Sequence, residues 1–171
     1  MKKVFLTLTV IATMAFANTA TAQGTIVDVA VDNEDFSTLV TALTAADLVA
    51  ALQAEGPFTV FAPNNAAFAK VDEATLSMLL EEENKEALAN LLTYHVVAGK
   101  LTAKDVVAAL DKGEGKVELK ALNGETLTVM QKDDKIWLKD ALGGYSEIIA
   151  TDVMGSNGVI HVINTVVMPK K

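Results

Sequence analysis

The stretch NGVIHVINTVVMP, residues 157–169, predicts the strand around which the rest of the chain is organised. It opens with an Asn-Gly turn dipeptide and continues as VIHVI, residues 159–163, in which His161 is the only polar side chain. An extended segment of this composition has no face that suits water, so we expect a central strand covered on both sides. Pro169 has no backbone N–H to donate, and we expect strand pairing to end there.

The first 22 residues have the order of parts of a secretory signal peptide. Lys2 and Lys3 precede an apolar run at residues 4–16, and Ala-Thr-Ala follows at residues 20–22. The run of about 13 residues is shorter than the roughly 18 to 20 that a membrane-spanning helix needs. We therefore expect residues 1–22 to be removed and residues 23–171 to form a single domain, which is secreted to the periplasm or the exterior of a bacterium without inserting into a membrane.

The composition excludes several classes of function. Removal of Lys2 and Lys3 leaves 12 of the 14 lysines against 22 acidic residues, a formal net charge of −10, and the sequence contains no arginine. Because arginine grips phosphate in a bidentate fork, nucleic acids and phospholipid headgroups are poor partners for this chain. The sequence also lacks cysteine, so disulfides, thiolate metal sites and a cysteine-linked lipid anchor are excluded.

The first half of the chain carries the signals of several short helices. Apolar residues recur at helical spacing through residues 36–43. Side chains able to cap helix N-termini precede four expected helices: Asp35, Thr44 with Asp47, Asp72, and Thr102 with Asp105. Between the helices, residues 58–62 and 94–97 predict short strands. Pro63 ends the first strand, and Asn64 can cap the helix that follows.

The second half changes to the period of a β-sheet. Apolar and polar side chains alternate through residues 117–129 around Asn123-Gly124, the strongest short signal for a β-hairpin. Asp133-Asp134 marks a second turn, and another strand is expected at residues 145–150. Helices first and strands later predict an α+β fold, or a β-sandwich with helices packed on one side.

Three segments together resemble the signature regions of the fasciclin (FAS1) domain family. They are GPFTVFAPNNAAF at residues 56–68, LLTYHVVAG at residues 91–99, and the opening stretch at residues 157–169. Their order and spacing agree with the family over the whole of residues 23–171. The resemblance implies a wedge-shaped β-sandwich with several short helices packed around it, and a role in cell adhesion.

The resemblance also implies a candidate contact site. Tyr94 and His95 resemble a tyrosine-histidine motif that some animal relatives use to bind cell-surface receptors, and Leu91 and Leu92 flank it. The alternative is a partly buried histidine, hydrogen-bonded to the backbone, that fixes the junction between a helix and a strand.

Other polar residues are expected to be structural. His161 lies among aliphatic residues and is expected to be a core histidine, and Pro63 and Asn64 shape a turn. With two histidines and no cysteine, the sequence shows no ligand spacing for zinc, and we expect neither a metal nor a cofactor. None of the serines lies in a Gly-x-Ser-x-Gly elbow, and we expect no catalytic residues.

The sequence therefore predicts a secreted, non-enzymatic binding or adhesion module that acts at the cell surface or in extracellular matrix through protein or polysaccharide contacts. Self-association would allow one such module to bridge two surfaces. One alternative is a soluble binder of a small apolar or sugar ligand in a cleft between helices and sheet. An outward-facing Trp137, able with Tyr145 to stack on sugars, or a sizeable apolar cleft would favour it. The second alternative is a secreted hydrolase that uses two facing carboxylates in a pocket.

Overall fold

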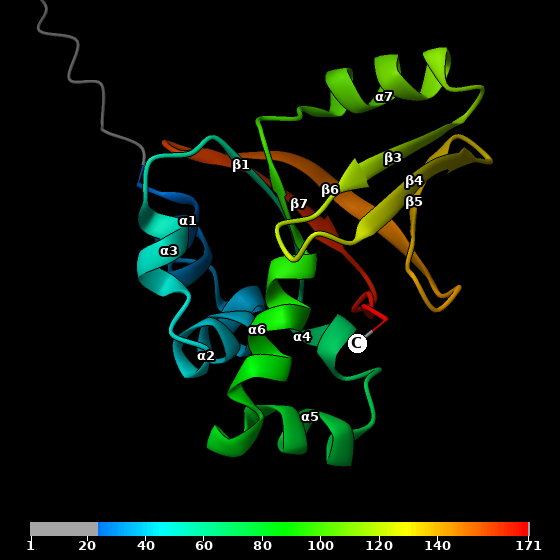
Figure 1. Ribbon diagram of the computed structural model, residues 1–171. Helices are drawn as coiled ribbons and strands as arrows, with labels where there is room; N and C mark the ends of the chain where they lie inside the picture. The colour runs from blue at the N-terminus through cyan, green and yellow to red at the C-terminus, as the bar shows by residue number, and fades with distance from the viewer. Residues whose placement is uncertain (1–23, 171) are drawn as a thin grey trace, which may run out of the picture.

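The computed structural model describes residues 24–170, so the expected signal peptide lies outside the described part of the chain. The helices are α1 (Ile26–Val31), α2 (Ser37–Ala45), α3 (Val49–Gln53), α4 (Asn65–Phe68), α5 (Glu73–Leu80), α6 (Lys85–Tyr94) and α7 (Ala103–Lys112), with 3₁₀ turns η1 (Glu34–Phe36) and η2 (Glu82–Asn84) (Figure 1). The strands are β1 (Phe58–Pro63), β2 (Val96–Ala98), β3 (Lys116–Lys120), β4 (Thr126–Lys132), β5 (Lys135–Lys139), β6 (Tyr145–Gly155) and β7 (Gly158–Ile163). The first half of the chain is mainly helical and the second half is mainly β, which confirms the predicted α+β class.

The strands form one hydrogen-bonded sheet in the order β2-β1-β7-β6-β5-β4-β3. β6 pairs with β5 through residues 145–147 and with β7 through residues 148–155. Two irregularities in the β6–β7 register, between Ile148 and Val153, mark the place where the strand changes partners. The sheet consequently folds into two layers, one containing β2, β1 and β7 and the other containing β3, β4 and β5.

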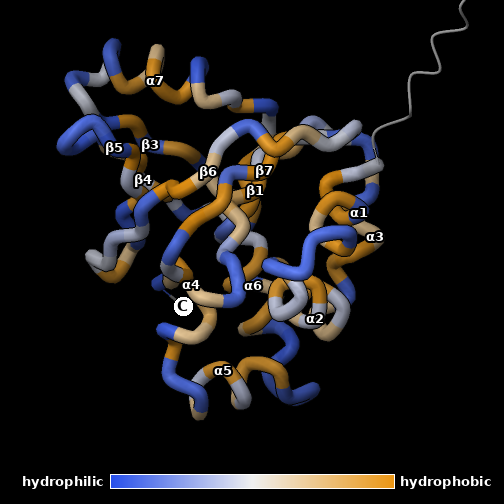
Figure 2. The backbone as a smooth tube through the Cα atoms, turned by 180° about the vertical axis from the view of Figure 1, so that it is seen from behind, coloured by the Kyte–Doolittle hydropathy of each residue, from blue (hydrophilic) through white to orange (hydrophobic). Residues whose placement is uncertain are grey.

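The sheet packs against two hydrophobic cores, and the β1–β7 layer contributes to both. Helices α1 to α6 gather on one side of the β1–β7 layer, where they bury Val60 and Ile160 (Figure 1). The inter-layer core lies between the two layers and contains Phe61, Tyr94, Val97, Val106, Leu110, Ala121, Leu127, Val129, Leu138, Ile163 and Val167. Helix α7, along which hydrophobic and hydrophilic positions alternate in Figure 2, contributes two of these residues. The molecule is thus built as helices, sheet layer, core and second sheet layer.

β7 is the central strand that the opening stretch predicts. It runs parallel to β1 and antiparallel to β6, and all six of its residues are buried. A Cβ atom at Gly158 would lie 2.3 Å from the carbonyl oxygen of Phe58, so the close approach of the two strands requires glycine. The strand ends at Ile163 and not at Pro169 as predicted, because the N–H of Thr165 donates to the Ser146 hydroxyl in place of the ladder, and the Asn164 side chain accepts the N–H of Glu147.

The predicted helix caps have mixed outcomes. Asp72, Asn64 and the Thr102–Asp105 capping box are confirmed, the Asn64 side chain accepting the N–H of Ala67 at 2.9 Å. Two predictions are wrong: Asn33 and not Asp35 caps the turn before α2, and the Thr44–Asp47 spacing forms no capping box. The Thr44 hydroxyl instead donates to the Val40 carbonyl within α2, which removes it as a cap.

The structure has a first helix, α1, that the apolar periodicity of the sequence does not predict. Thr25 and Asp28 form a complete capping box at its N-terminus, with the same Thr-x-x-Asp spacing as Thr102 and Asp105. The signal was therefore present in the sequence, at the start of the domain.

Candidate functional site

Tyr94 and His95 lie at the C-terminal end of α6 and not in a strand, which corrects the prediction for residues 94–97. Tyr94 ends the helix, His95 is its C-cap, and β2 begins at Val96. The Tyr94 hydroxyl donates to the carbonyl of Thr126 at 3.1 Å, and burial raises the pKa of Tyr94 to about 12. The phenol therefore ties α6 to the β3–β4 hairpin as a neutral group.

The four residues of the expected contact site are all buried. Tyr94 is fully buried, and His95, Leu91 and Leu92 are 2%, 4% and 3% exposed. Leu91 and Leu92 belong to the core under the helices, and Tyr94 belongs to the inter-layer core, because the end of α6 lies where the two cores meet. The candidate contact site therefore offers a partner no exposed side chain, and the alternative of a buried, hydrogen-bonded histidine agrees better with the structure.

His95 joins α6 to the C-terminal segment through both ring nitrogens. Its Nδ1 lies 2.8 Å from the Leu91 carbonyl and donates to it, and its Nε2 accepts the N–H of Val167 at 3.2 Å. This arrangement requires the neutral ring with its proton on Nδ1. Burial lowers the pKa of His95 to about 4, against the opposing effects of the Leu91 bond and the Asp140 charge.

His161 lies in β7, 1% exposed, inside the molecule. Its Nε2 donates to the Leu101 carbonyl at 2.7 Å, and its ring stacks on Phe61 at a centroid distance of 5.6 Å. Burial lowers the pKa of His161, so the ring is neutral at pH 7. The contacts join β7 to the segment before α7.

Pro63 is the last residue of β1, paired with Ile163, and Asn64 follows as a helix cap.

We predict that His161→Ala lowers the free energy of unfolding by roughly 1 to 3 kcal/mol, because the Leu101 carbonyl loses its buried donor. Urea unfolding measures the change. A midpoint equal to that of the wild type would show that His161 does not stabilise the fold.

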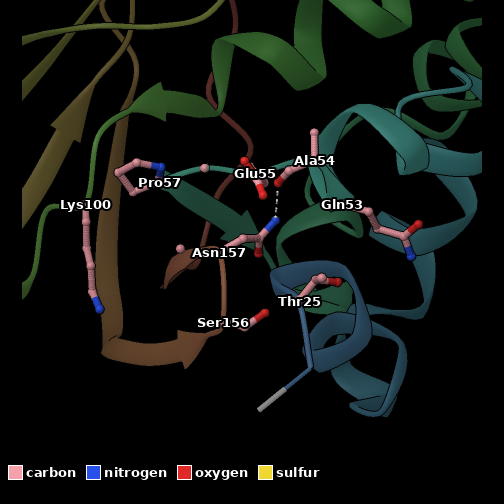
Figure 3. Close-up of a pocket in the computed structure, with 10 residues that line it drawn as sticks. Thr25, Gln53, Ala54, Glu55, Pro57, Lys100, Ser156 and Asn157 are labelled. Carbon is pink, nitrogen blue, oxygen red and sulfur yellow. Dashed lines mark hydrogen bonds between the residues drawn. The ribbon is translucent and has the colours of Figure 1, made fainter. Parts of the chain in front are cut away.

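A polar cleft of about 470 Å³ lies where α1, α3 and the β6–β7 turn meet (Figure 3). Asn157 lies in the middle of this cleft (Figure 3), and both polar atoms of its side chain are hydrogen-bonded to the backbone. Its Oδ1 accepts the N–H of Ile26, and its Nδ2 donates to the carbonyls of Leu52 and Ala54. The central side chain of the cleft is thus committed to holding the fold together, so we assign the cleft a structural role.

An apolar groove of about 560 Å³ separates α5 from α6 and the C-terminal segment. It is lined by Thr75, Leu79, Glu86, Ala87, Asn90, Leu91, Met168 and Pro169. α5 buries none of its residues completely, and Met78 on this helix is 57% exposed. The groove is the sizeable apolar cleft named above as a sign of ligand binding, although it lies between helices and the C-terminal segment and not against the sheet.

The β3–β6 layer presents a second candidate surface. Side chains alternate between the inter-layer core and solvent along β3, β4 and β5, and no helix of the described chain covers the solvent side (Figure 1). We call this side, together with the start of β6, the outer face. It displays Tyr145, 51% exposed, and half-buried Trp137, whose indole N–H has no hydrogen-bond partner among the described residues. Ile149, 48% exposed, lies further along β6, at the first irregularity in the β6–β7 register.

Two carboxylates, Glu125 and Asp140, line a cleft on the outer face. Both oxygens of Asp140 accept backbone N–H groups, Oδ1 from Leu142 and Gly144 and Oδ2 from Met168. A carboxylate held by three backbone N–H groups in this way shapes a loop. Within residues 24–170 we find no cluster of metal-ligating side chains and no helix long and apolar enough to cross a bilayer.

Comparisons with known proteins agree with this architecture. The chain is 52% identical over 145 residues to Protein sll1483 of Synechocystis sp., an alignment that covers 85% of this chain and 73% of that protein. It is 36% identical over 146 residues to transforming growth factor-beta-induced protein ig-h3 of Sus scrofa, covering 85% of this chain and 19% of that much longer protein. Among solved structures, a FAS1 domain pair from the insect cell adhesion molecule Fasciclin I matches with a TM-score of 0.73 and 18% identity, covering 83% of this chain and 50% of that one.

The similarity to Fasciclin I shows the shared fold, including the β-sandwich. The family model described as Fasciclin domain matches residues 34–169, which contain all three segments that carry the resemblance in the sequence. The chain therefore belongs to the fasciclin domain family.

Proposed function

We propose that this protein is a secreted, non-enzymatic binding module that acts at the cell surface or in extracellular matrix through protein or polysaccharide contacts on its outer face. The observation that carries the proposal is the combination of an uncovered sheet face with exposed Tyr145 on it and exposed Ile149 further along the same strand. Large apolar side chains gathered on an open surface are typical of contact sites. The fold shared with a cell adhesion molecule supports the same role.

The outer face replaces the Tyr94–His95 region as the proposed contact site. The buried side chains at the end of α6 hold the domain together, whereas the outer face can meet a partner without a conformational change. A single domain can link two surfaces when a second copy or a second binding face takes part.

Adherence of the labelled protein to the producing cells tests this proposal. We expect saturable adherence, and we expect the double variant Tyr145→Ser, Ile149→Ser to reduce the bound fraction at least fivefold, because it removes the exposed apolar contacts. Met78→Ser, which changes an equally exposed apolar residue on α5, is the matched control and should adhere like the wild type. Non-saturable adherence, or equal losses in both variants, would contradict the proposal.

A second candidate function is the binding of a small apolar ligand in the groove between α5 and α6. The almost wholly apolar lining of this groove favours it. Titration with a fluorescent fatty acid should then show a 1:1 complex, and Leu79→Gln should weaken it. An unchanged fluorescence signal over the titration would remove this candidate.

A further inference from the structure

The strand registers arrange the outer face into rows of side chains. One row runs Lys116, Met130, Trp137 and Glu147 across four strands. The next row runs Glu118, Thr128, Lys139 and Tyr145, and a third pairs Lys120 with Thr126. Residues in one row lie opposite each other on neighbouring strands and point to the same side of the sheet. The sequence of each strand therefore determines the chemistry of the face.

Lysines recur along the two strands that flank β4 in the sheet. β3 carries Lys116 and Lys120, and β5 carries Lys135 and Lys139. β3 and β5 are both one strand away from β4, so the two lines of lysines are about 10 Å apart. With Lys132 the strands of this face carry five lysines against Glu118 and Glu147, in a chain whose formal net charge is −8. Glu125 and Asp140, in the adjoining loops, add two further carboxylates. The strands of the face thus carry more lysines than carboxylates, within an acidic protein.

A cleft of about 640 Å³ runs along β4 between these lines. We call it the β4 trough. Its floor contains the side chains of Thr126, Thr128 and Met130, and Lys116 and Lys139 flank it on either side. The floor thus offers hydroxyl groups and one apolar surface, while the sides offer ammonium groups.

The positive charges of the outer face are incompletely paired. Lys135 forms an ion pair with Glu147 at 2.7 Å, and Lys116 lies 3.4 Å from Glu118. Lys132 stands directly opposite Lys135, an arrangement of like charges that destabilises a sheet, and has no carboxylate within ion-pair distance in the described structure. Lys139 lies over the Tyr145 ring, 5.7 Å from its centroid. An anion in the trough would meet Lys139, whose charge no carboxylate of the described chain neutralises within ion-pair distance.

The acidic residues around the trough restrict the kind of anion. Glu125 and Asp140 line one part of it, and Asp133 and Asp134 form the β4–β5 turn. These charges repel a densely charged polymer, and the chain has no arginine for bidentate contacts with phosphate or sulfate. A polymer with about one carboxylate per sugar can place its charges beside the lysines and its hydroxyl groups beside the threonines.

We propose that the β4 trough binds an acidic polysaccharide whose negative charges are carboxylates, with Lys116 and Lys139 as the main cationic contacts and Tyr145 as a stacking surface at the side. This inference rests on the proposed function, because it names the class of partner for the same face. It makes the ionic contacts, rather than the apolar ones, the determinant of partner choice.

Calorimetric titration of the protein lacking residues 1–22 with alginate oligosaccharides tests the inference. We expect Lys116→Gln with Lys139→Gln to raise the Kd at least tenfold, because both flanks of the trough lose their charge. The control is the double variant Lys104→Gln, Lys112→Gln on α7, which removes the same number of positive charges as the trough variant. Both of these lysines are exposed. This control should change the Kd less than twofold. Binding of the wild type should also weaken as salt is added.

Three further results would overturn the inference: no binding of alginate, equal binding of uncharged dextran, or equal weakening in the trough and α7 variants. Thermal unfolding of each variant confirms that the comparison is between folded proteins. Adherence to cells separates this inference from the proposed function. If Tyr145-dependent adherence persists without alginate binding, the polysaccharide inference alone is wrong, whereas absent adherence contradicts the proposed function itself.

Discussion

Asn157→Ala is expected to lower the free energy of unfolding by roughly 3 to 4 kcal/mol, although Asn157 is neither catalytic nor in the core. The substitution removes three hydrogen bonds at once, of 2.9 Å from Ile26 N and of 2.7 and 2.9 Å to the carbonyls of Leu52 and Ala54. Each group left behind is part of the backbone and lies at or near the end of a helix, where no other partner is in place.

The size of this effect follows from the position of Asn157 between distant parts of the chain. Its bonds span 131 residues to α1 and 105 residues to α3, so one side chain fixes the first helices against the β6–β7 turn. Close packing reinforces the arrangement, since a Cβ atom at Gly56 would lie 2.1 Å from the carbonyl oxygen of Asn157. The backbone therefore cannot shift to make compensating contacts.

Urea unfolding measures the loss of stability in Asn157→Ala. We expect the midpoint to fall to a lower urea concentration while the m-value stays unchanged. Ser156→Ala is the matched control, because Ser156 lies in the same turn with an exposed side chain and should change stability by less than about 0.5 kcal/mol. If the two variants unfold at the same urea concentration, the three hydrogen bonds do not stabilise the domain.

Hydrophobic patterning was sufficient to predict the central strand, the β-meander and most helices. β7 is buried on both sides because its sequence offers no polar face, and Asn123-Gly124 joins β3 to β4 because this dipeptide suits a tight turn. Capping signals were less reliable. Thr44 and Thr102 both stand three residues before an aspartate, and only Thr102 forms the box, because the Thr44 hydroxyl bonds within its own helix.

The site was harder to predict than the fold. The Tyr94–His95 motif was prominent in the sequence, but only the packing of α6 between two cores shows that these side chains are buried. The lysines of β3 and β5 were visible as alternating residues, yet their position on either side of β4 depends on strand order and register. Asn157 was interpreted as a turn residue, and its three contacts come from segments far away in the sequence.

We expect the domain to lose stability as the pH falls from 6.5 towards 4, with His95 as a principal cause. The pKa of His95 is about 4 in the folded protein and close to 6.5 in the unfolded chain. Between these values the unfolded chain binds a proton that the folded protein excludes, so the free energy of unfolding increases with pH. The contribution is complete above pH 6.5 and is lost progressively below it, by roughly 3 kcal/mol at pH 4.

His95→Gln isolates this contribution from the titration of the carboxylates. A glutamine amide can donate to the Leu91 carbonyl and accept the N–H of Val167, as the neutral histidine does, but it cannot bind a proton in this range. Urea midpoints measured from pH 7.5 to 4 should therefore fall more steeply in the wild type than in the variant. His161, whose pKa is also lowered by burial, stays in both proteins and cancels in the difference. Parallel curves would contradict the prediction, because they would show that His95 binds a proton equally well in the folded and unfolded states. The hydrogen bonds of His95 with Leu91 and Val167 require a neutral ring, so equal protonation would mean that the end of α6 opens.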